Sequence, residues 1–168
     1  MGFGALIATI VAMTLLVSAM YVFVAGGHFM SETLNCAVKE MQSLKGEQMR
    51  TKIEISDVNI SSNTDMNVTI NNTGEERIRE FSKMDVIVSY YSQRGKEVRW
   101  LPYTQSTPPK NDTWAVVKIR PDEMNPGILD PAEALNIWIR LSSPLDTNKS
   151  GWLVVATPNG VKTSSYLG

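Results

Sequence analysis

The chain has 168 residues with nearly balanced charge, 16 Lys and Arg against 17 Asp and Glu. This balance lacks the basic excess that nucleic-acid-binding domains need, and it therefore indicates no nucleic-acid partner. Because Cys36 is the only cysteine, an intrachain disulfide and a cysteine-based metal cluster are both excluded.

The first predicted element is an apolar helix near the N-terminus. Residues 1–31 contain no Asp, Glu, Lys or Arg, and a predominantly apolar run extends from Ala5 to Ala25. As a helix, this run would be about 31 Å long, which is enough to cross the hydrocarbon core of a bilayer. We therefore predict a membrane helix over residues 1–27 in a single-pass protein of the cell membrane. A cleaved leader and the helical core of a filament are the alternatives.

A short heptad pattern follows the apolar run. Its apolar positions are spaced 4, 3, 4 and 3 residues apart, and Glu, Lys and Gln fill the outside. We predict that residues 28–50 form a helical stalk, so that one helix extends over residues 5–49. Cys36 is interpreted as a small apolar residue of this stalk rather than as an interchain disulfide. The apolar positions are candidates for a helix–helix contact between two subunits, or for a face against the protein's own domain or lipid headgroups: Met30, Leu34, Ala37, Met41 and Leu44.

Beyond residue 50 the spacing of apolar residues changes to a period of two, which is typical of strands. Ile53–Ile60 is predicted to be a strand with a bulge near Asp57, and Asn67–Asn71 alternates between core and solvent. Further alternating runs, separated by turns rich in Gly, Pro and Asn, give seven or eight strands and no long helix. Residues 51–168 are therefore predicted to form an all-β antiparallel sandwich of the immunoglobulin-like kind.

Five Asn-x-Ser/Thr sequons lie in the predicted β domain and are candidate N-glycosylation sites. Each is an acceptor only if the domain reaches a glycosylating compartment, so their number favours an extracytoplasmic β domain with the N-terminus inside. Ordinary turn and strand-edge chemistry would also account for them. They are Asn59, Asn67, Asn71, Asn111 and Asn148.

One aromatic residue is a candidate partner contact. Trp138 should point away from the face that Ile137 and Ile139 form with their alternating neighbours. If that opposite face lies outside the sandwich, Trp138 becomes an interface anchor. Alternatively, it covers the sheet edge or packs under a loop.

The sequence predicts no catalytic residue, metal site or cofactor site. Calcium binding by the 122–133 loop, through Asp122, Glu123, Asp130 and Glu133, is the minor alternative, because this loop lacks the regular acidic spacing of known calcium loops. His28 is the only histidine, and it lies at the membrane boundary, where it cannot serve a triad in the β domain. The carboxylate pairs Glu75-Glu76 and Asp122-Glu123 lie in turn or loop sequence and are interpreted as solvated charges. We therefore predict a binding or structural protein rather than an enzyme.

Several segments resemble the archaellum accessory proteins of the FlaF and FlaG type. They are the start Met1–Gly4 running into an apolar helix, IEISDVNI at Ile53–Ile60, GILDPAEALNIWIRL at Gly127–Leu141, and VVATPNGVKTSSYL at Val154–Leu167. The resemblance implies a stator-like component of the archaeal motility machinery, with an immunoglobulin-like sandwich on the pseudo-periplasmic side. It also implies two partners, the surface-layer protein and a paralogous accessory subunit, and assembly as a homodimer or hetero-oligomer.

Archaellins and archaeal pilins, which are type IV pilin-like, share the architecture of an apolar helix and a β-sandwich. In that alternative the chain is a subunit of a cell-surface filament, with residues 1–45 forming the helical core and the sandwich exposed. The sequence departs from this pattern because no basic leader precedes the apolar run and because the segment after it is charged. If a leader has already been removed, the first of these differences disappears.

Overall fold

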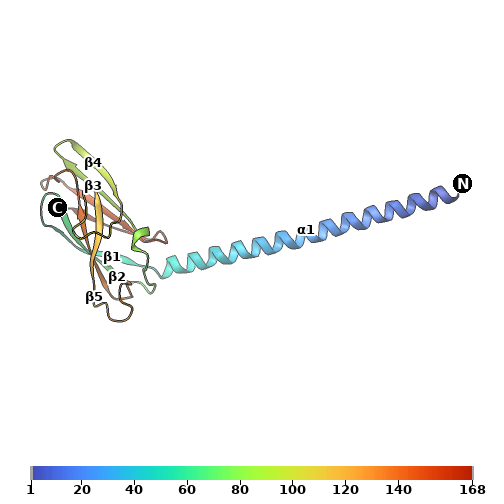
Figure 1. The fold of residues 1–168 in the computed structure, drawn as a ribbon, viewed down its shortest axis with the longest axis horizontal. Coiled ribbons are helices and arrows are strands. Elements are labelled where there is room, and N and C mark those ends of the chain that lie inside the picture. The colour runs from blue at the N-terminus through green and yellow to red at the C-terminus, as the bar shows by residue number, and fades with distance from the viewer. Residues whose placement is uncertain (1, 168) are drawn as a thin grey trace. The chain divides into compact units, whose positions relative to one another are not determined.

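The computed structural model describes residues 2–167 as one long helix followed by eight strands (Figure 1). The chain divides into two compact units, Met1–Leu44 and Lys45–Gly168. The second unit holds all the strands and a short 3-10 helix at Phe81–Lys83.

Helix α1 extends from Gly2 to Arg50 without interruption at Gly26-Gly27, which confirms the prediction of a single long helix. By length and composition it is able to cross a membrane, with a mean hydropathy of 2.3 in its most apolar window. Its polar side chains bond the helix's own carbonyls. The Thr9 hydroxyl donates to the Leu6 carbonyl at 2.9 Å, and the Thr14 hydroxyl donates to the Val11 carbonyl at 2.9 Å. These bonds satisfy hydroxyl groups that lipid could not.

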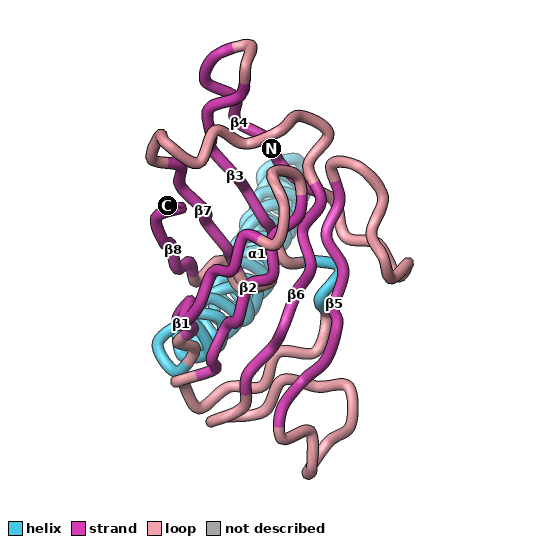
Figure 2. Tube along the Cα trace, turned by 90° about the vertical axis from the view of Figure 1, so that its left-hand side faces the viewer, coloured by secondary structure: helices cyan, strands magenta, loops and turns pink. Residues whose placement is uncertain are grey.

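The β domain consists of two four-stranded antiparallel sheets, which confirms the predicted antiparallel sandwich of seven or eight strands (Figure 2). The first sheet has the order β1-β2-β6-β5, and the second has the order β4-β3-β7-β8. The strands are β1 (Ile53–Ile60), β2 (Asp65–Asn72), β3 (Asp85–Ser92), β4 (Gly95–Leu101), β5 (Thr113–Arg120), β6 (Ala134–Arg140), β7 (Gly151–Ala156) and β8 (Lys162–Leu167).

The hydrophobic core lies between the inner faces of the two sheets. Alternate residues of the first sheet, such as Val68 and Ile137, are fully buried, and so are Val88 and Leu153 of the second sheet. Fully burying one such side chain contributes about 1.5–3 kcal/mol to folding. Among the described residues, every buried one lies between Thr51 and Leu167, so the second unit carries a complete core of its own.

The first strand contains the predicted bulge. The pairing of β1 with β2 shifts between Ile55 and Asp57, which leaves Ser56 without a partner in the register. Because of this extra residue, Val58 pairs with Val68 and Ile60 pairs with Met66, so both point to the same face as their partners. A second shift, between Val116 and Lys118 of β5, had no predicted counterpart.

Candidate partner-binding surfaces

The two sheets present chemically different outer faces. The outer face of the first sheet is polar, with Asn67, Thr69 and Asn136 on adjacent strands. The outer face of the second sheet is apolar at its middle, where Ile87 of β3 lies between Trp100 of β4 and Val154 of β7, and polar residues such as Ser89 and Lys96 lie farther along it. An exposed apolar face of this kind marks an interaction surface more often than a polar one does.

The predicted sequons are divided between the polar face and two loops. Asn59 and Asn67 lie opposite each other on β1 and β2, and both are exposed. Asn71 lies on the same face but is half-buried, and its side-chain oxygen accepts a hydrogen bond from Ser56 at 3.3 Å. Asn111 lies in the β4–β5 loop and Asn148 in the β6–β7 loop, and both are exposed. Their glycosylation stays a prediction.

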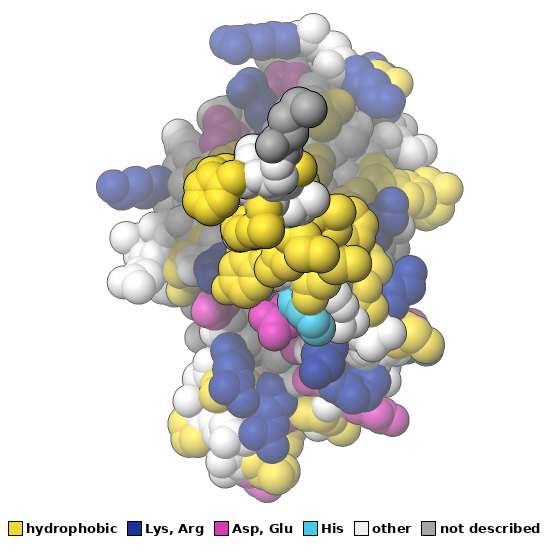
Figure 3. Space-filling model, turned by 90° about the vertical axis from the view of Figure 1, so that its right-hand side faces the viewer, with side chains coloured by type: hydrophobic (Ala, Val, Ile, Leu, Met, Phe, Trp, Pro, Cys, Tyr) yellow, Lys and Arg dark blue, Asp and Glu magenta, His cyan; other side chains and the backbone are white. Residues whose placement is uncertain are grey.

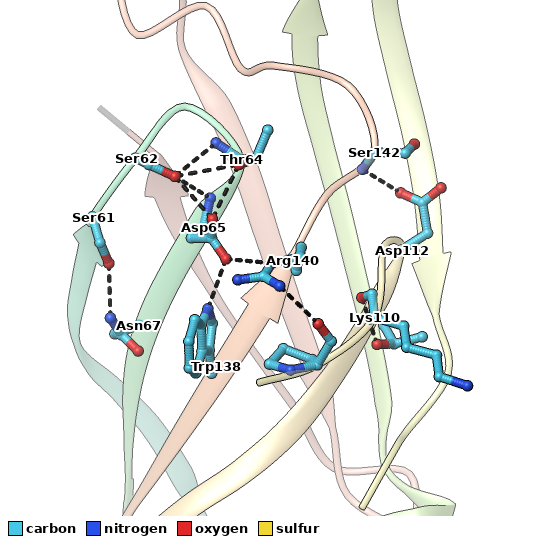
Figure 4. A network of polar contacts seen from close by, with 12 residues as sticks. Ser61, Ser62, Thr64, Asp65, Asn67, Lys110, Asp112, Trp138, Arg140 and Ser142 are labelled. Carbon is cyan, nitrogen blue, oxygen red and sulfur yellow. Dashed lines mark hydrogen bonds and ion pairs between the residues drawn. The ribbon is translucent and has the colours of Figure 1, made fainter. Parts of the chain in front are cut away.

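A hydrogen-bonded network occupies one end of the polar face (Figure 4). One carboxylate oxygen of Asp65 accepts bonds from Arg140 Nε at 2.7 Å and from Trp138 Nε1 at 2.9 Å. The other oxygen accepts bonds from the hydroxyls of Ser62 at 2.9 Å and Thr64 at 3.0 Å. Burial alone would raise the pKa of Asp65, but the bonds from Arg140, Trp138, Ser62 and Thr64 together hold that pKa below its ordinary value of 3.8. The side chain is therefore held in its ionised form.

This network determines the environment of Trp138. The tryptophan lies on the outer face, as its place in the alternation predicted, and it is half-buried. The Arg140 guanidinium lies over its ring, with the Cζ atom 5.2 Å from the ring centroid. Arg140 also donates to the Pro109 carbonyl at 3.2 Å, which ties the β4–β5 loop to the same cluster. A partner contact at Trp138 stays a prediction, and it would involve a ring already held in place.

Two aromatic residues of the second sheet, Trp100 and Tyr166, are more exposed than Trp138. The exposed fractions are 59% for Trp100 and 68% for Tyr166. Trp100 is oriented by its indole N–H, which donates to Asp85 at 2.9 Å. Trp152 and Tyr166 lie opposite each other on β7 and β8 and pack edge to face, with ring centroids 4.3 Å apart.

The sequence of β7 does not reveal its outer aromatic face. Residues 152–156 form a continuous apolar run, which is typical of a strand covered on both sides. In the structure Leu153 and Val155 face the core, while Trp152 and Val154 face outward and are half-exposed. Because both faces of β7 carry apolar residues, its sequence lacks the alternation of apolar and polar residues that identifies the exposed face of other strands.

The acidic loop before β6 uses its carboxylates internally. Asp130 is buried, and its carboxylate pairs with Arg77 Nε at 3.0 Å and accepts a bond from Asn125 Nδ2 at 2.8 Å. The Glu133 carboxylate accepts the Asp130 backbone N–H at 3.0 Å. Among residues 2–167, no group of three or more His, Cys, Asp or Glu side chains is arranged to hold a metal ion.

The last turn of α1 belongs to the second unit and is fastened to it. Arg50 forms an ion pair with Glu76, and the Arg50 carbonyl accepts the Glu75 backbone N–H at 2.8 Å. Gln48 donates to the Asn159 carbonyl at 2.6 Å, and the Asn159 amide donates to the Thr51 hydroxyl at 2.7 Å. Two separate turns of the β domain therefore hold the helix terminus.

Hydrophobic side chains gather on the exposed surface of the N-terminal unit (Figure 3). The predicted helix–helix contact residues are all exposed on α1. Met30 and Met41 expose 66% and 63% of their surface, which is unusual for methionine in a soluble helix. Their exposure leaves the face available to a second helix, to lipid or to another subunit. The set Met30, Leu34, Ala37, Met41 and Leu44 stays a prediction.

Two comparisons find similar sequences over nearly the whole chain. The family model described as archaeal-type flagellin matches residues 1–167. An uncharacterized protein of Archaeoglobus fulgidus is 32% identical over 166 residues, which cover 98% of this chain and 95% of that protein.

Solved structures show a similar fold. The archaellum periplasmic stator protein FlaG from Sulfolobus acidocaldarius has a TM-score of 0.53 at 23% identity, covering 69% of this chain and 98% of that chain. The periplasmic stator complex of FlaF and FlaG from the same organism has a TM-score of 0.53 at 25% identity, covering 69% and 88%. An archaeal flagellin from Methanocaldococcus jannaschii has a TM-score of 0.50 at 9% identity, also covering 69% and 88%.

Proposed function

Because the chain belongs to the archaeal-type flagellin family, we propose that it is a membrane-anchored, stator-type accessory component of the archaellum. Its relatives with named roles are structural components of the archaellum rather than enzymes. In this proposal α1 anchors the chain in the cell membrane, and the β-sandwich on the extracytoplasmic side binds the surface-layer lattice. The anchored domain then gives the rotating filament a fixed support.

The change from an uncharged to a charged segment within α1 is the observation that supports this proposal. Its first 31 residues have no charged side chain, whereas Glu32, Lys39, Glu40, Lys45 and Glu47 follow within the next 16 positions. In the tightly packed core of a filament these charges would be buried among neighbouring helices, which is costly unless each is paired. An anchor that leaves the membrane after residue 27 keeps them in water.

The fastened helix terminus supports a mechanical role. A force on the sandwich reaches the chain of α1 through the bonds of Arg50, Gln48 and Thr51 to two turns of the β domain. Several short bonds between rigid elements transmit force better than a flexible linker of Gly and Ser. The structure of FlaF with FlaG supports a paralogous accessory subunit as a further partner.

A binding measurement tests the proposal. The full chain in detergent is immobilised and exposed to purified surface-layer protein, at neutral and at acidic pH. We expect recovery of the surface-layer protein, and no recovery on a matched support that carries residues 2–44 alone. Failure of the full chain to retain surface-layer protein at both pH values would overturn lattice binding. The same assay with the paralogous subunit tests the second partner.

A filament subunit is the second candidate, favoured by the match to the flagellin family model over nearly the whole chain. In that case residues 1–45 form the core of a helical polymer and the sandwich decorates its surface. The two candidates differ in where the chain resides after the filaments are removed from the cell.

A further inference from the structure

The outer face of the second sheet contains a depression with a volume of about 560 Å³. It is bounded by β3, β4, β7, β8 and the β6–β7 loop, all within the second unit. Three aromatic side chains line it, namely Tyr91, Trp152 and Tyr166. Lys96, Lys149 and Asn148 are among the polar residues around them.

The aromatic side chains are held by the register of the sheet. Trp152 lies between Ser89 of β3 and Tyr166 of β8, and Tyr91 lies opposite Lys96 of β4. Trp152 and Tyr166 pack edge to face, with an interplanar angle of 87°. In this arrangement the edge of one ring lies against one face of the other, and Tyr166 still exposes 68% of its surface, so ring surface remains available to a ligand.

The β6–β7 loop at the rim is preorganised by Asp146. The backbone N–H of Asp146 donates to the Tyr91 carbonyl at 2.7 Å, which fixes the loop to the end of β3. The Asp146 carboxylate accepts the backbone N–H of Asn148 at 3.1 Å. Lys149 follows directly, and its ammonium lies 5.2 Å from the centroid of the Tyr91 ring. A ligand would therefore meet a formed rim and lose little affinity to ordering.

The charge of the depression is positive. Its lining includes two lysines and no Asp or Glu. Lys149 makes a long ion pair with Asp146, at 3.6 Å, whereas Lys96 makes no ion pair among residues 2–167. An anionic group above the aromatic floor would be attracted by both ammonium groups, with little screening across so short a distance.

We propose that this depression binds an acidic carbohydrate, a sugar unit that carries a carboxylate or sulfate group. The apolar C–H face of a sugar ring matches the exposed rings of Trp152 and Tyr166. Its hydroxyl groups match the Ser89 hydroxyl and the Asn148 amide, and its acidic group matches Lys96 and Lys149. A protein partner fits less well, because lysine and serine are depleted at the centres of protein interfaces.

A titration of the full chain in detergent tests this inference independently of the stator role. The protein is made in a host without N-glycosylation, so that Asn148 carries no glycan. The probes are a hyaluronan tetrasaccharide, which carries carboxylates, and fully N-acetylated chitotetraose, a neutral oligosaccharide of the same length. Binding is measured by calorimetry and by tryptophan fluorescence.

We expect hyaluronan tetrasaccharide to bind with a Kd of about 0.1–1 mM, and chitotetraose to bind at least about fivefold more weakly. Trp152→Ala should weaken hyaluronan binding by about tenfold or more. Tyr166→Ala should also weaken hyaluronan binding, and the fold should tolerate this substitution well because Tyr166 is exposed. Lys96→Gln should reduce the preference for hyaluronan over chitotetraose. The matched control is Trp100→Ala, which removes an exposed tryptophan from the same sheet outside the depression.

Three results would overturn the inference. The first is that neither oligosaccharide shows saturable binding. The second is hyaluronan binding that Trp152→Ala and Tyr166→Ala leave unchanged while both variants retain the wild-type circular dichroism spectrum. The third concerns binding of surface-layer protein. If Tyr166→Ala abolishes this binding but enzymatic deglycosylation of the lattice leaves it unchanged, the face binds protein rather than carbohydrate.

Discussion

At the residue scale, the Asp65 carboxylate joins segments that are far apart in the chain. It pairs with Arg140 and Trp138 on β6 and with Ser62 and Thr64 in its own turn. The sequence predicted the outward direction of Trp138 from alternation alone. The pairing of β2 with β6 depends on the topology of the whole sheet, and no local pattern in the sequence indicates that Asp65 and Arg140 meet.

The lowered pKa of Asp65 gives a pH dependence of definite sign. Because the pKa is lower in the folded state than in the unfolded chain, this carboxylate stabilises the fold above its ordinary value of 3.8, and the contribution is lost as the pH falls through the folded pKa. We expect Asp65→Asn to reduce the free energy of unfolding at pH 7 by about 1 kcal/mol. The difference from wild type should shrink at pH 2–3, as measured by urea unfolding of residues 45–168.

The matched control is Asp57→Asn on the adjacent strand β1. Asp57 is exposed, and its side chain makes no hydrogen bond among residues 2–167. This substitution should leave unfolding unchanged at both pH values. A difference between wild type and Asp65→Asn that stays constant from pH 7 to pH 2 would contradict the role given to the Asp65 carboxylate.

Gly74 is required by a close approach of two backbone segments. A Cβ atom at this position would lie 2.4 Å from the Lys52 nitrogen and 2.5 Å from the Arg50 carbonyl oxygen. Gly74→Ala must therefore displace backbone at the point where the helix terminus is fastened. We expect a loss of about 1–3 kcal/mol in the free energy of unfolding, measured by guanidinium denaturation.

Gly46→Ala is the control for Gly74→Ala, because a Cβ at Gly46 meets nothing within 4 Å. Because Gly46 lies in a helix, Gly46→Ala should raise the free energy of unfolding by up to about 1 kcal/mol. Equal effects of the two substitutions would show that the close approach at Gly74 does not constrain the domain.

At the scale of elements, alternation predicted the strands that have one polar face. In β2 and β6 the buried residues alternate with Asn, Thr and Trp, so both the strand and its inward face could be read from the sequence. The bulge of β1 was predictable because two alternating pairs, Ile53 with Ile55 and Val58 with Ile60, are out of phase. In β7 the apolar outer face removed this signal, and the aromatic depression there could not be predicted.

The heptad residues of α1 give a prediction about pairing. In a parallel pair of helices with this seam, Ala37 occupies a d position close to its counterpart, while Lys39 occupies the outermost f position. In a Cys36→Ser background we expect Ala37→Cys to form a disulfide-linked dimer under mild oxidation in membranes. Lys39→Cys should stay largely monomeric on non-reducing gels. Equal cross-linking of the two variants would contradict a specific seam.

At the scale of the whole molecule, the protein combines a membrane-compatible helix with a domain whose two faces differ. The polar face carries three of the five sequons, and the aromatic face carries the depression. The sequence predicted the helix and the sandwich, because charge-free length and strand periodicity are local features, and the archaellum relationship was implied by the resemblance of several segments to that family. Which residues share the polar face and which share the aromatic face depends on the pairing of strands, and this pairing is seen only in the structure.

An anchored accessory component of the archaellum and a subunit of its filament should separate differently when cells are sheared. Native cells are therefore sheared, and filaments are separated from envelopes. Both fractions are probed by immunoblot for this chain and for the major archaellin. We expect the chain to remain with the envelope and to be released only by detergent, while the archaellin follows the filaments. Recovery of the chain in the sheared filaments, with residues 1–45 in the core of their helical reconstruction by electron microscopy, would contradict the anchored role.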